Sequence, residues 1–472
     1  MIVNRPKNIF VAAREFVGKR GECFQYPFVG IGSGRNLQHQ VVMVVVANPA
    51  SMMKYDKTHC IRLNRDPGMS TLEKSAVYCK NQCMKLKTER VRLRKTFEQR
   101  YGPGSTPRVA LAPGRSNLIG EHTDYNGGLV LPIAVDRHTA VLFRPSTLSA
   151  APRLSVYAEV LDASDDFALG TVKRTNDPAQ HWANYVRGVA WALARRGITL
   201  KGGAMYITSD LPRGAGLSSS ASLEVAIGLA LLTLAGEKMD AQELAFACQE
   251  AEHRFAGVRC GIMDQTIVAR AKAGHALLLD CDSMQVQQVP ITLNGYALAV
   301  FDTGVRHKLA SSEYNKRRAE CEHAARVMKK KNLRGVQLDD LLKAAHKLTA
   351  SEHRRVRHVL TENFRVVQFS AALARGDIHE LGRLLSASHQ SLALDYEVSC
   401  AELDTLVSQL ALKNSVDKAC PGARMTGGGF GGSVVALIKS TAFPDYAKAM
   451  QPYAKGGSLL LAPESGASVL NL

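Results

Sequence analysis

The pattern of hydrophobic and polar residues changes at about residue 108. Up to residue 69, neither the 3.6-residue period of a helix nor the two-residue alternation of a strand is sustained. The basic segment from Thr71 to Tyr101 places apolar residues such as Met84 and Phe97 among many Lys and Arg residues, which predicts a solvated helix. We therefore expect residues 1–84 to be an extension and a lead-in to the main fold.

After residue 108, predicted strands and helices alternate. Apolar runs predict strands at 109–112, 129–135 and 433–438. Residues 217–232 are apolar on every side, which is typical of a buried helix. Asp240 and Glu243 have the spacing of a capping box, and the helix that they begin is expected to end at Gly257. Two more helical patterns cover 311–330 and 353–375. This order predicts an α+β fold with two domains, 85–290 and 291–472.

Composition indicates an ordinary globular protein in a reducing compartment. Of the 472 residues, 46% are hydrophobic and 22% are charged, and the longest apolar run, Val41 to Ala47, is too short to span a membrane. The first 20 residues lack the apolar centre of a secretory signal. The ten cysteines have no repeated pair spacing, which favours reduced thiols and a cytoplasmic location. The basic N-terminus leaves an organellar location open.

The net charge of +18 is unevenly distributed along the chain. Residues 1–106 hold 19 of the 60 Lys and Arg residues but only 7 of the 42 Asp and Glu residues. Two thirds of the excess positive charge therefore lies in the first quarter of the chain. The mildly basic remainder suits an anionic nucleotide, and we expect neither a nucleic acid nor a membrane as partner.

A segment rich in glycine and serine, from Pro212 to Ser222, precedes the predicted buried helix. Gly214 and Gly216 allow the backbone to approach a ligand closely, and the serines lie where unpaired N–H groups at the start of a helix favour an anion. This segment, taken alone, is explained equally well in two ways: as a cradle for phosphates, or as a turn that only caps a core helix. The segment has no Gly-Lys-Ser/Thr and is not a Walker loop.

Four segments together resemble one family, the galactokinases of the GHMP kinase superfamily. Residues 216–222 (GLSSSAS) are similar to the second GHMP motif, and residues 426–432 (TGGGFGG) are similar to the third. Residues 113–126 (PGRSNLIGEHTDYN) resemble the galactokinase signature, and residues 260–265 (CGIMDQ) resemble the segment with the catalytic aspartate. The resemblance implies a two-domain GHMP kinase fold with the active site in the cleft between the domains. It also implies transfer of the γ-phosphoryl group of ATP to the C1 hydroxyl of galactose.

Residues 115–124 carry an unusual density of ionisable side chains for a loop between two strands. Carboxylates accept hydrogen bonds from sugar hydroxyls, and an imidazole donates or accepts, so a polyhydroxylated ligand explains this density better than fold stability does. Backbone capping remains an alternative role for Glu121 or Asp124. The resemblance implies galactose contacts at Arg115, Glu121, His122, Asp124, Gly261, Asp264 and Tyr314.

The resemblance also implies two catalytic residues. Asp264 would accept the proton of the C1 hydroxyl or orient that hydroxyl for attack. Arg115 would lie beside it, where its positive charge favours the ionised aspartate and offsets charge on the transferred phosphoryl group.

ATP and Mg²⁺ are the expected cofactors. Ser220 and Glu252 are the implied Mg²⁺ ligands, with a surface position as the alternative for Glu252. Trp182 and Tyr185 are three residues apart on a predicted helix and would present their rings to adenine, with core packing as the alternative. The implied contacts in the phosphate loop are Gly214, Gly216, Leu217, Ser218, Ser219, Ser220, Ala221 and Ser222.

Two other functions remain compatible with these motifs. An N-acetylgalactosamine kinase shares most of them but needs space beside C2 of the sugar. A sensor of galactose and ATP without catalysis would lack the Ser-Ala dipeptide, which is intact here as Ser220 and Ala221. The oligomeric state is not predicted, although a monomer is favoured. Because the resemblance begins near residue 85, residues 1–68 are expected to be dispensable, with Met69 as an alternative start.

Overall fold

The computed structural model describes residues 11–17, 23–29, 91–146, 152–212, 214–306 and 310–472. The chain separates into two compact units, Met1–Ser75 and Ala76–Leu472. In the first unit, β1 (Val11–Val17) and β2 (Cys23–Val29) form an antiparallel pair. Both strands lie in the part of the chain where the sequence shows no sustained helical or strand period. A two-stranded ladder joins backbone N–H and C=O groups, so it does not require alternating side chains.

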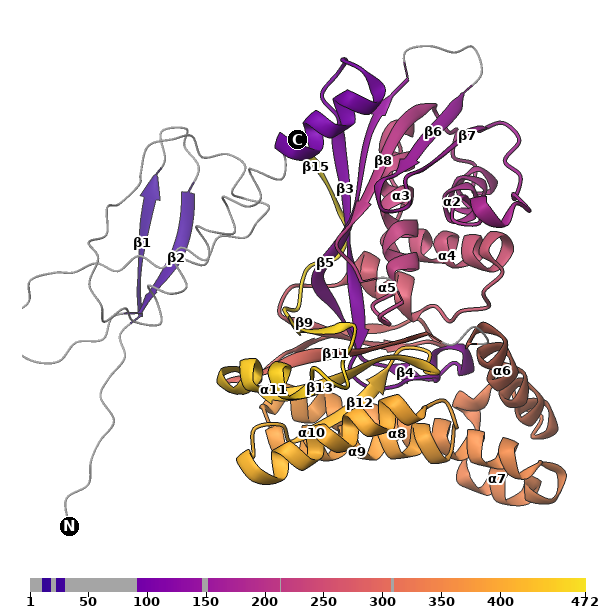
Figure 1. Ribbon diagram of the computed structural model, residues 1–472, viewed down its shortest axis with the longest axis vertical. Helices are drawn as coiled ribbons and strands as arrows, with labels where there is room; N and C mark the ends of the chain where they lie inside the picture. The colour runs from indigo at the N-terminus through magenta and orange to yellow at the C-terminus, as the bar shows by residue number, and fades with distance from the viewer. Residues whose placement is uncertain (1–10, 18–22, 30–90, 147–151, 213, 307–309) are drawn as a thin grey trace, which may run out of the picture. The chain divides into compact units, whose positions relative to one another are not determined.

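The second unit contains a six-stranded sheet in the order β15-β3-β5-β8-β6-β7 (Figure 1). All neighbouring strands are antiparallel except β6 and β8, which are parallel. The strands are β3 (Arg108–Asn117), β5 (Pro132–Pro145), β6 (Arg153–Ala158), β7 (Ala163–Ala168), β8 (Gly203–Ser209) and β15 (Ser468–Asn471).

The strands predicted at 109–112 and 129–135 are confirmed, but their extents differ. The first is longer than predicted, and the second divides into the short β4 (Leu129–Val130) and β5. The last strand, β15, pairs with β3, although the end of the chain was expected to belong to the second domain. Antiparallel pairing depends on where strands meet in space and not on their order in the sequence.

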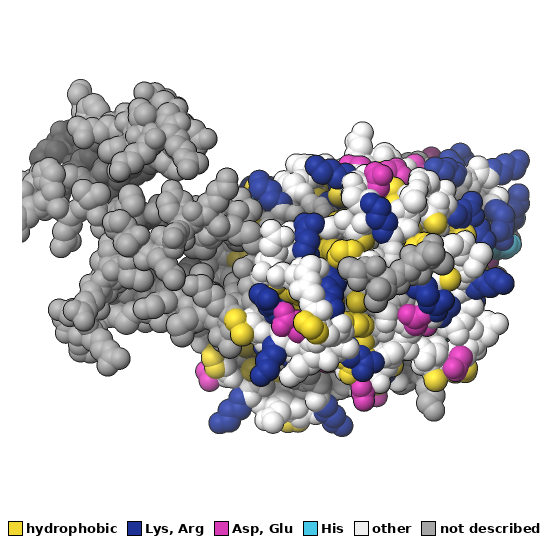
Figure 2. Space-filling model, turned by 90° about the horizontal axis from the view of Figure 1, so that it is seen from above, with side chains coloured by type: hydrophobic (Ala, Val, Ile, Leu, Met, Phe, Trp, Pro, Cys, Tyr) yellow, Lys and Arg dark blue, Asp and Glu magenta, His cyan; other side chains and the backbone are white. Residues whose placement is uncertain are grey.

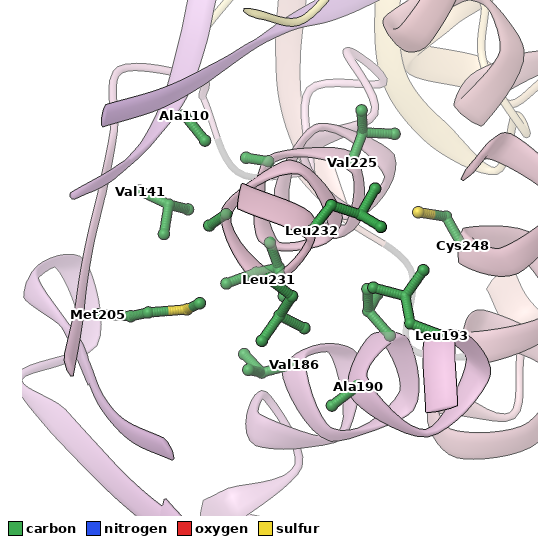
Figure 3. Packing of buried hydrophobic residues seen from close by; sticks show 14 of the residues in the cluster. Ala110, Val141, Val186, Ala190, Leu193, Met205, Val225, Leu231, Leu232 and Cys248 are labelled. Carbon is green, nitrogen blue, oxygen red and sulfur yellow. The ribbon is translucent and has the colours of Figure 1, made fainter. Parts of the chain in front are cut away.

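Three helices enclose a core beside this sheet (Figures 1 and 3). They are α2 (Ala183–Arg195), α3 (Ser219–Ala235) and α4 (Ala241–Ala251). Helix α3 lies against β3 and β5, and α2 and α4 pack against α3. Figure 3 shows side chains from all three, among them Val186, Leu231 and Cys248, pointing into one apolar cluster with Met205 of β8. The predicted buried helix is confirmed as α3, which has buried residues around its whole circumference.

The helix predicted to begin at Asp240 is also confirmed. The Asp240 carboxylate accepts hydrogen bonds from the backbone N–H groups of Gln242 and Glu243. The helix continues as a π-helical turn, η5 (Glu252–Ala256), and ends at Gly257, whose φ of 80° is left-handed. That turn carries Glu252, so the end of α4 positions a predicted metal ligand.

A second sheet, of four strands, has the order β12-β13-β11-β14, and a third has the order β10-β9-β4. Figure 1 shows helices α8, α9 and α10 along one side of the four-stranded sheet. The strands are β9 (His275–Asp280), β10 (Val286–Pro290), β11 (Tyr296–Arg306), β12 (Gly422–Thr426), β13 (Gly431–Lys439) and β14 (Gly457–Leu461). The predicted strand at 433–438 lies within β13.

The remaining helices include both long helical patterns predicted after residue 300. The helices are α5 (Met263–Arg270), α6 (Ala310–Val327), α7 (Leu338–Ala344), α8 (Ala350–Arg375), α9 (Ile378–Leu394), α10 (Ala401–Asp417) and α11 (Phe443–Met450). Short 3₁₀ turns are η2 (Asp124–Asn126), η3 (Glu159–Leu161), η4 (Pro178–Gln180), η6 (Leu333–Gly335), η7 (Ala345–Lys347) and η8 (Ser440–Ala442).

The helix predicted over 71–101 is seen over 91–101, and residues 71–90 lie outside the described residues. This helix is not simply solvated, because Leu93 and Phe97 are buried against Val109 and Leu142 of the six-stranded sheet. On the face drawn in Figure 2, Lys and Arg side chains are spread over the surface with Asp and Glu among them. In the part of the chain that the structure describes, none of the helices combines the length and apolar character needed to cross a membrane.

Candidate active site

The two predicted catalytic residues form a direct ion pair. Arg115, near the end of β3, donates from Nε to Asp264 Oδ1 at 2.7 Å and from Nη2 to Asp264 Oδ2 at 2.5 Å. The register of β3 against β5 shifts between Pro113 and Gly114, immediately before Arg115, and such irregularities re-aim nearby side chains. The hydroxyl of Ser218 donates a further hydrogen bond to Asp264 Oδ2. A carboxylate on α5 is thus held from the first sheet and from the phosphate loop.

The phosphate loop begins at the left-handed residues Gly214 and Gly216 and leads directly into α3. The backbone carbonyl of Gly216 accepts a hydrogen bond from Arg115 Nη1 at 2.5 Å. A side chain on Gly216 would place its Cβ 3.2 Å from the carbonyl oxygen of Thr426, at the start of the third glycine segment. The two glycine segments therefore approach each other backbone to backbone.

Not all predicted residues of this loop present their side chains to a ligand. Leu217 and Ala221 are buried in apolar clusters, and the Ser222 hydroxyl donates to the backbone carbonyl of Ala112 at 2.8 Å. Any contact of these residues with a nucleotide would therefore come from the backbone. Ser218 adopts a left-handed φ of 53°, which turns its side chain toward Asp264.

Glu121 joins the signature loop to the third glycine segment. Its Oε1 accepts from the backbone N–H of Gly427 at 2.7 Å and from the Thr426 hydroxyl at 3.0 Å, and it pairs with Arg424 at 2.9 Å. Its Oε2 accepts from Asn117 at 3.0 Å. Capping of a loop backbone was the alternative role for this residue, and the structure contains that bond. Contact of Glu121 with a sugar stays a prediction.

Asp124 and Gly261 touch each other. A Cβ on Gly261 would overlap the Asp124 carboxylate, so glycine is needed for the two segments to approach this closely. Burial raises the pKa of Asp124 to about 7, and the negative charge of Asp264 acts in the same direction. A cavity of about 280 Å³ lies beside these residues and is lined by Asp124, Tyr125, Phe246, Gln249, Cys260, Gly261, Ile262, Cys281, Met284 and Arg318.

His122 belongs to a chain of hydrogen-bonded rings. Its Nε2 lies 3.1 Å from the carbonyl oxygen of Gly428, so this nitrogen carries the hydrogen, and Nδ1 accepts from the Tyr125 hydroxyl at 2.7 Å. Tyr125 in turn lies 2.9 Å from the Tyr396 hydroxyl. Burial lowers the pKa of His122 to about 3. The predicted sugar contact Tyr314 packs on this cluster, with its ring 5.4 Å from that of His122.

The predicted metal ligands also lie together, with two residues that the sequence analysis did not select. Glu252 accepts a hydrogen bond from Nε2 of Gln265 at 2.8 Å, and Ser220 acts to lower the pKa of Glu252. The same Nε2 donates to the buried Glu224 at 3.1 Å. Burial raises the pKa of Glu252 to about 7 and that of Glu224 well above its usual value. Within the described residues, neither carboxylate forms an ion pair with Lys or Arg.

The predicted adenine contacts lie at the start of α2. Trp182 packs at the edge of the apolar cluster around α3, and its buried Nε1 has no hydrogen-bond partner among the described residues. Tyr185 is partly buried, and its pKa is raised by burial and by the charges of Glu252 and Glu224. The core packing that was the alternative reading is present for Trp182. A role for either ring in nucleotide binding stays a prediction.

The sequence analysis did not select two residues that bond the predicted site residues, Gln265 and Arg424. Gln265 is the last residue of the segment with the catalytic aspartate, and its adjacency to Asp264 was a usable signal. Arg424 lies two residues before the third glycine segment, and it is fully buried against Glu121. The six cysteines in residues 91–472 all carry free thiols, as predicted: Cys248, Cys260, Cys281, Cys321, Cys400 and Cys420.

Three family models match the chain. They are described as "GHMP kinases N terminal domain" at residues 184–272, "Galactokinase galactose-binding signature" at residues 95–145 and "GHMP kinases C terminal" at residues 369–449. The signature match contains Arg115, Glu121, His122 and Asp124. The N-terminal match contains the phosphate loop, both metal candidates and Asp264.

Two relatives and one solved structure cover most of the second unit. The chain is 47% identical to a galactokinase of Chloroflexus aggregans over 359 residues, which is 75% of this chain and 89% of the relative. It is 42% identical to a galactokinase of Homo sapiens over 391 residues, which is 80% of this chain and 96% of the relative. The structure of Lactococcus lactis galactokinase complexed with galactose matches with a TM-score of 0.75 and 31% identity, covering 80% of this chain and 99% of that chain. With these identities and the galactose-binding signature, the chain belongs to the galactokinase family of the GHMP kinases.

Proposed function

We propose that this protein transfers the γ-phosphoryl group of MgATP to the C1 hydroxyl of D-galactose, giving galactose 1-phosphate and ADP. As a member of its family it is an ATP-dependent sugar kinase. The observation that carries the residue-level proposal is the carboxylate of Asp264, which Arg115 and Ser218 hold beside the phosphate loop. The structure of a similar protein in complex with galactose supports the choice of sugar.

Asp264 is proposed to orient the C1 hydroxyl of galactose and to accept its proton as the oxygen attacks phosphorus. Arg115 donates hydrogen bonds to both oxygens of this carboxylate and so fixes its orientation. The carboxylate can then accept the proton from one direction only. The guanidinium also bonds the loop expected to bind the phosphates, so its charge can offset charge on the transferred group. Positioning of this kind supplies most of the catalysis in phosphoryl transfer.

The nucleotide would be held by the start of α3. The first N–H groups of a helix have no partners within the helix, and together with the left-handed glycines before them they form a site for phosphate oxygens. Because the third glycine segment lies against this loop, its backbone is proposed to close over the phosphates from the second sheet.

Mg²⁺ would be held by Ser220 and Glu252. The site fits a divalent cation, because the buried carboxylates of Glu252 and Glu224 have no Lys or Arg partner among the described residues. A hydroxyl and a carboxylate are oxygen donors of the kind that Mg²⁺ prefers. When bound, the cation would supply positive charge that offsets the negative charge of the phosphates.

A coupled ADP-release assay against free sugars tests the proposal. We expect galactose to give the highest kcat/KM, because a buried hydrogen-bonding site leaves its own groups unpaired when a hydroxyl is misplaced. The panel includes glucose and N-acetylgalactosamine. If N-acetylgalactosamine matches or exceeds galactose, the acceptor is wrong while the fold and the family stand. If galactose binds without ADP release, the protein is a sensor and the catalytic proposal fails.

We also propose that the protein is a cytoplasmic enzyme and that residues 1–68 are dispensable. Its proposed domains are 85–290 and 291–472, except that the last strand, β15, belongs to the sheet of the first domain. A chain that begins at Met69 is expected to keep its melting temperature and its kcat/KM for galactose, because every contact described at the site lies within residues 112–433. Thermal melts and kinetics of both chains test this. A loss of several degrees, or a clear fall in kcat/KM, would show that the extension is part of the folded enzyme.

A further inference from the structure

A group of four side chains, three of them buried and one partly exposed, lies at the proposed metal site. Glu252 and Glu224 are 5% and 0% exposed, Gln265 is 0% exposed, and Cys260 lies beside them. Glu224 follows Ser220 by four residues on α3, so the two lie on the same helix face one turn apart. This arrangement connects the phosphate loop, the end of α4 and the start of α5.

The hydrogen bonds of this group converge on one oxygen of Glu252. Gln265 Nε2 donates to Glu252 Oε2 at 2.8 Å, and the Cys260 thiol donates to the same oxygen at 3.1 Å. With Oε2 held by two donors, Oε1 is the oxygen left to a cation. A side chain at the end of a helix has several rotamers, and these bonds select one of them.

Glu224 in turn orients the amide of Gln265. Its Oε2 accepts from the same Nε2 at 3.1 Å, so the amide nitrogen faces two carboxylates and the amide oxygen faces neither. Glu224 Oε1 and Gln265 Oε1 are both buried without a hydrogen-bond partner among the described residues. Unpaired buried oxygens are costly for a fold, and therefore the group is not explained as a device for stability alone.

We infer that Gln265 is a positioning residue for the metal site: its amide, oriented by Glu224, holds Glu252 in the rotamer that receives the cation. The inference rests on the proposed function, in which Glu252 is a metal ligand. Gln265 directly follows Asp264, so the first turn of α5 positions the proposed base with one side chain and the proposed metal ligand with the next. Residues that orient ligands in this way typically contribute 10- to 100-fold to metal affinity.

The test is direct binding of Mn²⁺ to the full-length protein in the presence of a non-hydrolysable ATP analogue, measured by electron paramagnetic resonance. Gln265→Met keeps the length of the side chain but removes the donor, and Gln265→Glu also adds a third carboxylate. We expect the Kd for Mn²⁺ to rise about 10-fold or more in Gln265→Met. Galactose affinity should stay within about twofold, and turnover should recover as Mg²⁺ is raised, which a general structural defect would not produce.

Thr266→Val is the matched control, since Thr266 is the adjacent buried residue and bonds Gln242 instead of the carboxylates. It should bind Mn²⁺ like the unaltered protein, and Glu252→Gln should bind it weakly. If Gln265→Met folds poorly, Gln265→Glu carries the test. Unchanged Mn²⁺ affinity in the Gln265 variants, with weak binding in Glu252→Gln, would overturn the inference and leave the proposed function intact. Unchanged affinity in Glu252→Gln as well would overturn both the inference and the proposed metal site.

Discussion

Replacement of Asp264 by asparagine is expected to lower kcat for galactose phosphorylation by at least ~10²-fold, the low end of what a positioned acid–base group contributes. The substitution preserves size but removes the charge that pairs with Arg115. An asparagine has only one side-chain oxygen to accept a hydrogen bond from the Arg115 guanidinium. Its NH₂ group would stand where the second oxygen was, so two donors would face each other. Both proton acceptance and the direction of that acceptance are then lost.

Steady-state kinetics with saturating galactose and ATP measure this effect, and equilibrium binding of an ATP analogue should change little. Asp166→Asn is a suitable control, because Asp166 forms an exposed ion pair with Arg153, and such pairs contribute at most about 1 kcal/mol to stability. The control should keep normal activity. A near-normal kcat in Asp264→Asn would remove Asp264 from the mechanism.

Replacement of Gly261 by alanine is expected to lower kcat/KM for galactose by about 10- to 100-fold, the range that corresponds to loss of one hydrogen bond to a charged group. The added Cβ would overlap the Asp124 carboxylate, which must then leave its place. The proposed sugar contact at Asp124 would be lost although its side chain is unaltered. The effect should appear mainly in KM for galactose, while KM for ATP stays nearly constant.

Gly170→Ala is the matched control, since an added Cβ at that position meets no atom within 4 Å and the backbone there is not left-handed. Kinetics over a range of galactose and ATP concentrations separate the two KM values, and thermal melts show whether Gly261→Ala remains folded. An unchanged KM for galactose in a folded Gly261→Ala protein would mean that Asp124 does not bind the sugar.

Local sequence was sufficient for the elements whose signals are short in range. The all-apolar run of α3, the Asp240 cap and Gly257 lie in one stretch of chain, so their pattern specified a helix and its end without tertiary information. The glycines and serines at 212–222 likewise indicated a turn before a helix, although they did not decide whether that turn binds phosphate. The β1–β2 pair was not among the predicted elements. The division of 129–145 into two strands depends on separate partner sheets, because β4 pairs with β9 and β5 pairs with β3.

By itself, the sequence determined the family, through four motifs in order, and it supplied the candidates for the residues that carry the chemistry. Only the tertiary structure decided which of these residues touch. Arg115 and Asp264 are 149 positions apart, and Glu121 reaches Gly427 across 306 positions. Contacts at such separations arise from the packing of sheets and helices. This packing places Gln265 against Glu252, and it turns the Ser222 hydroxyl toward the backbone of Ala112. A motif specifies what a side chain is able to do, but its partners come from other elements, and packing alone brings them within hydrogen-bonding distance.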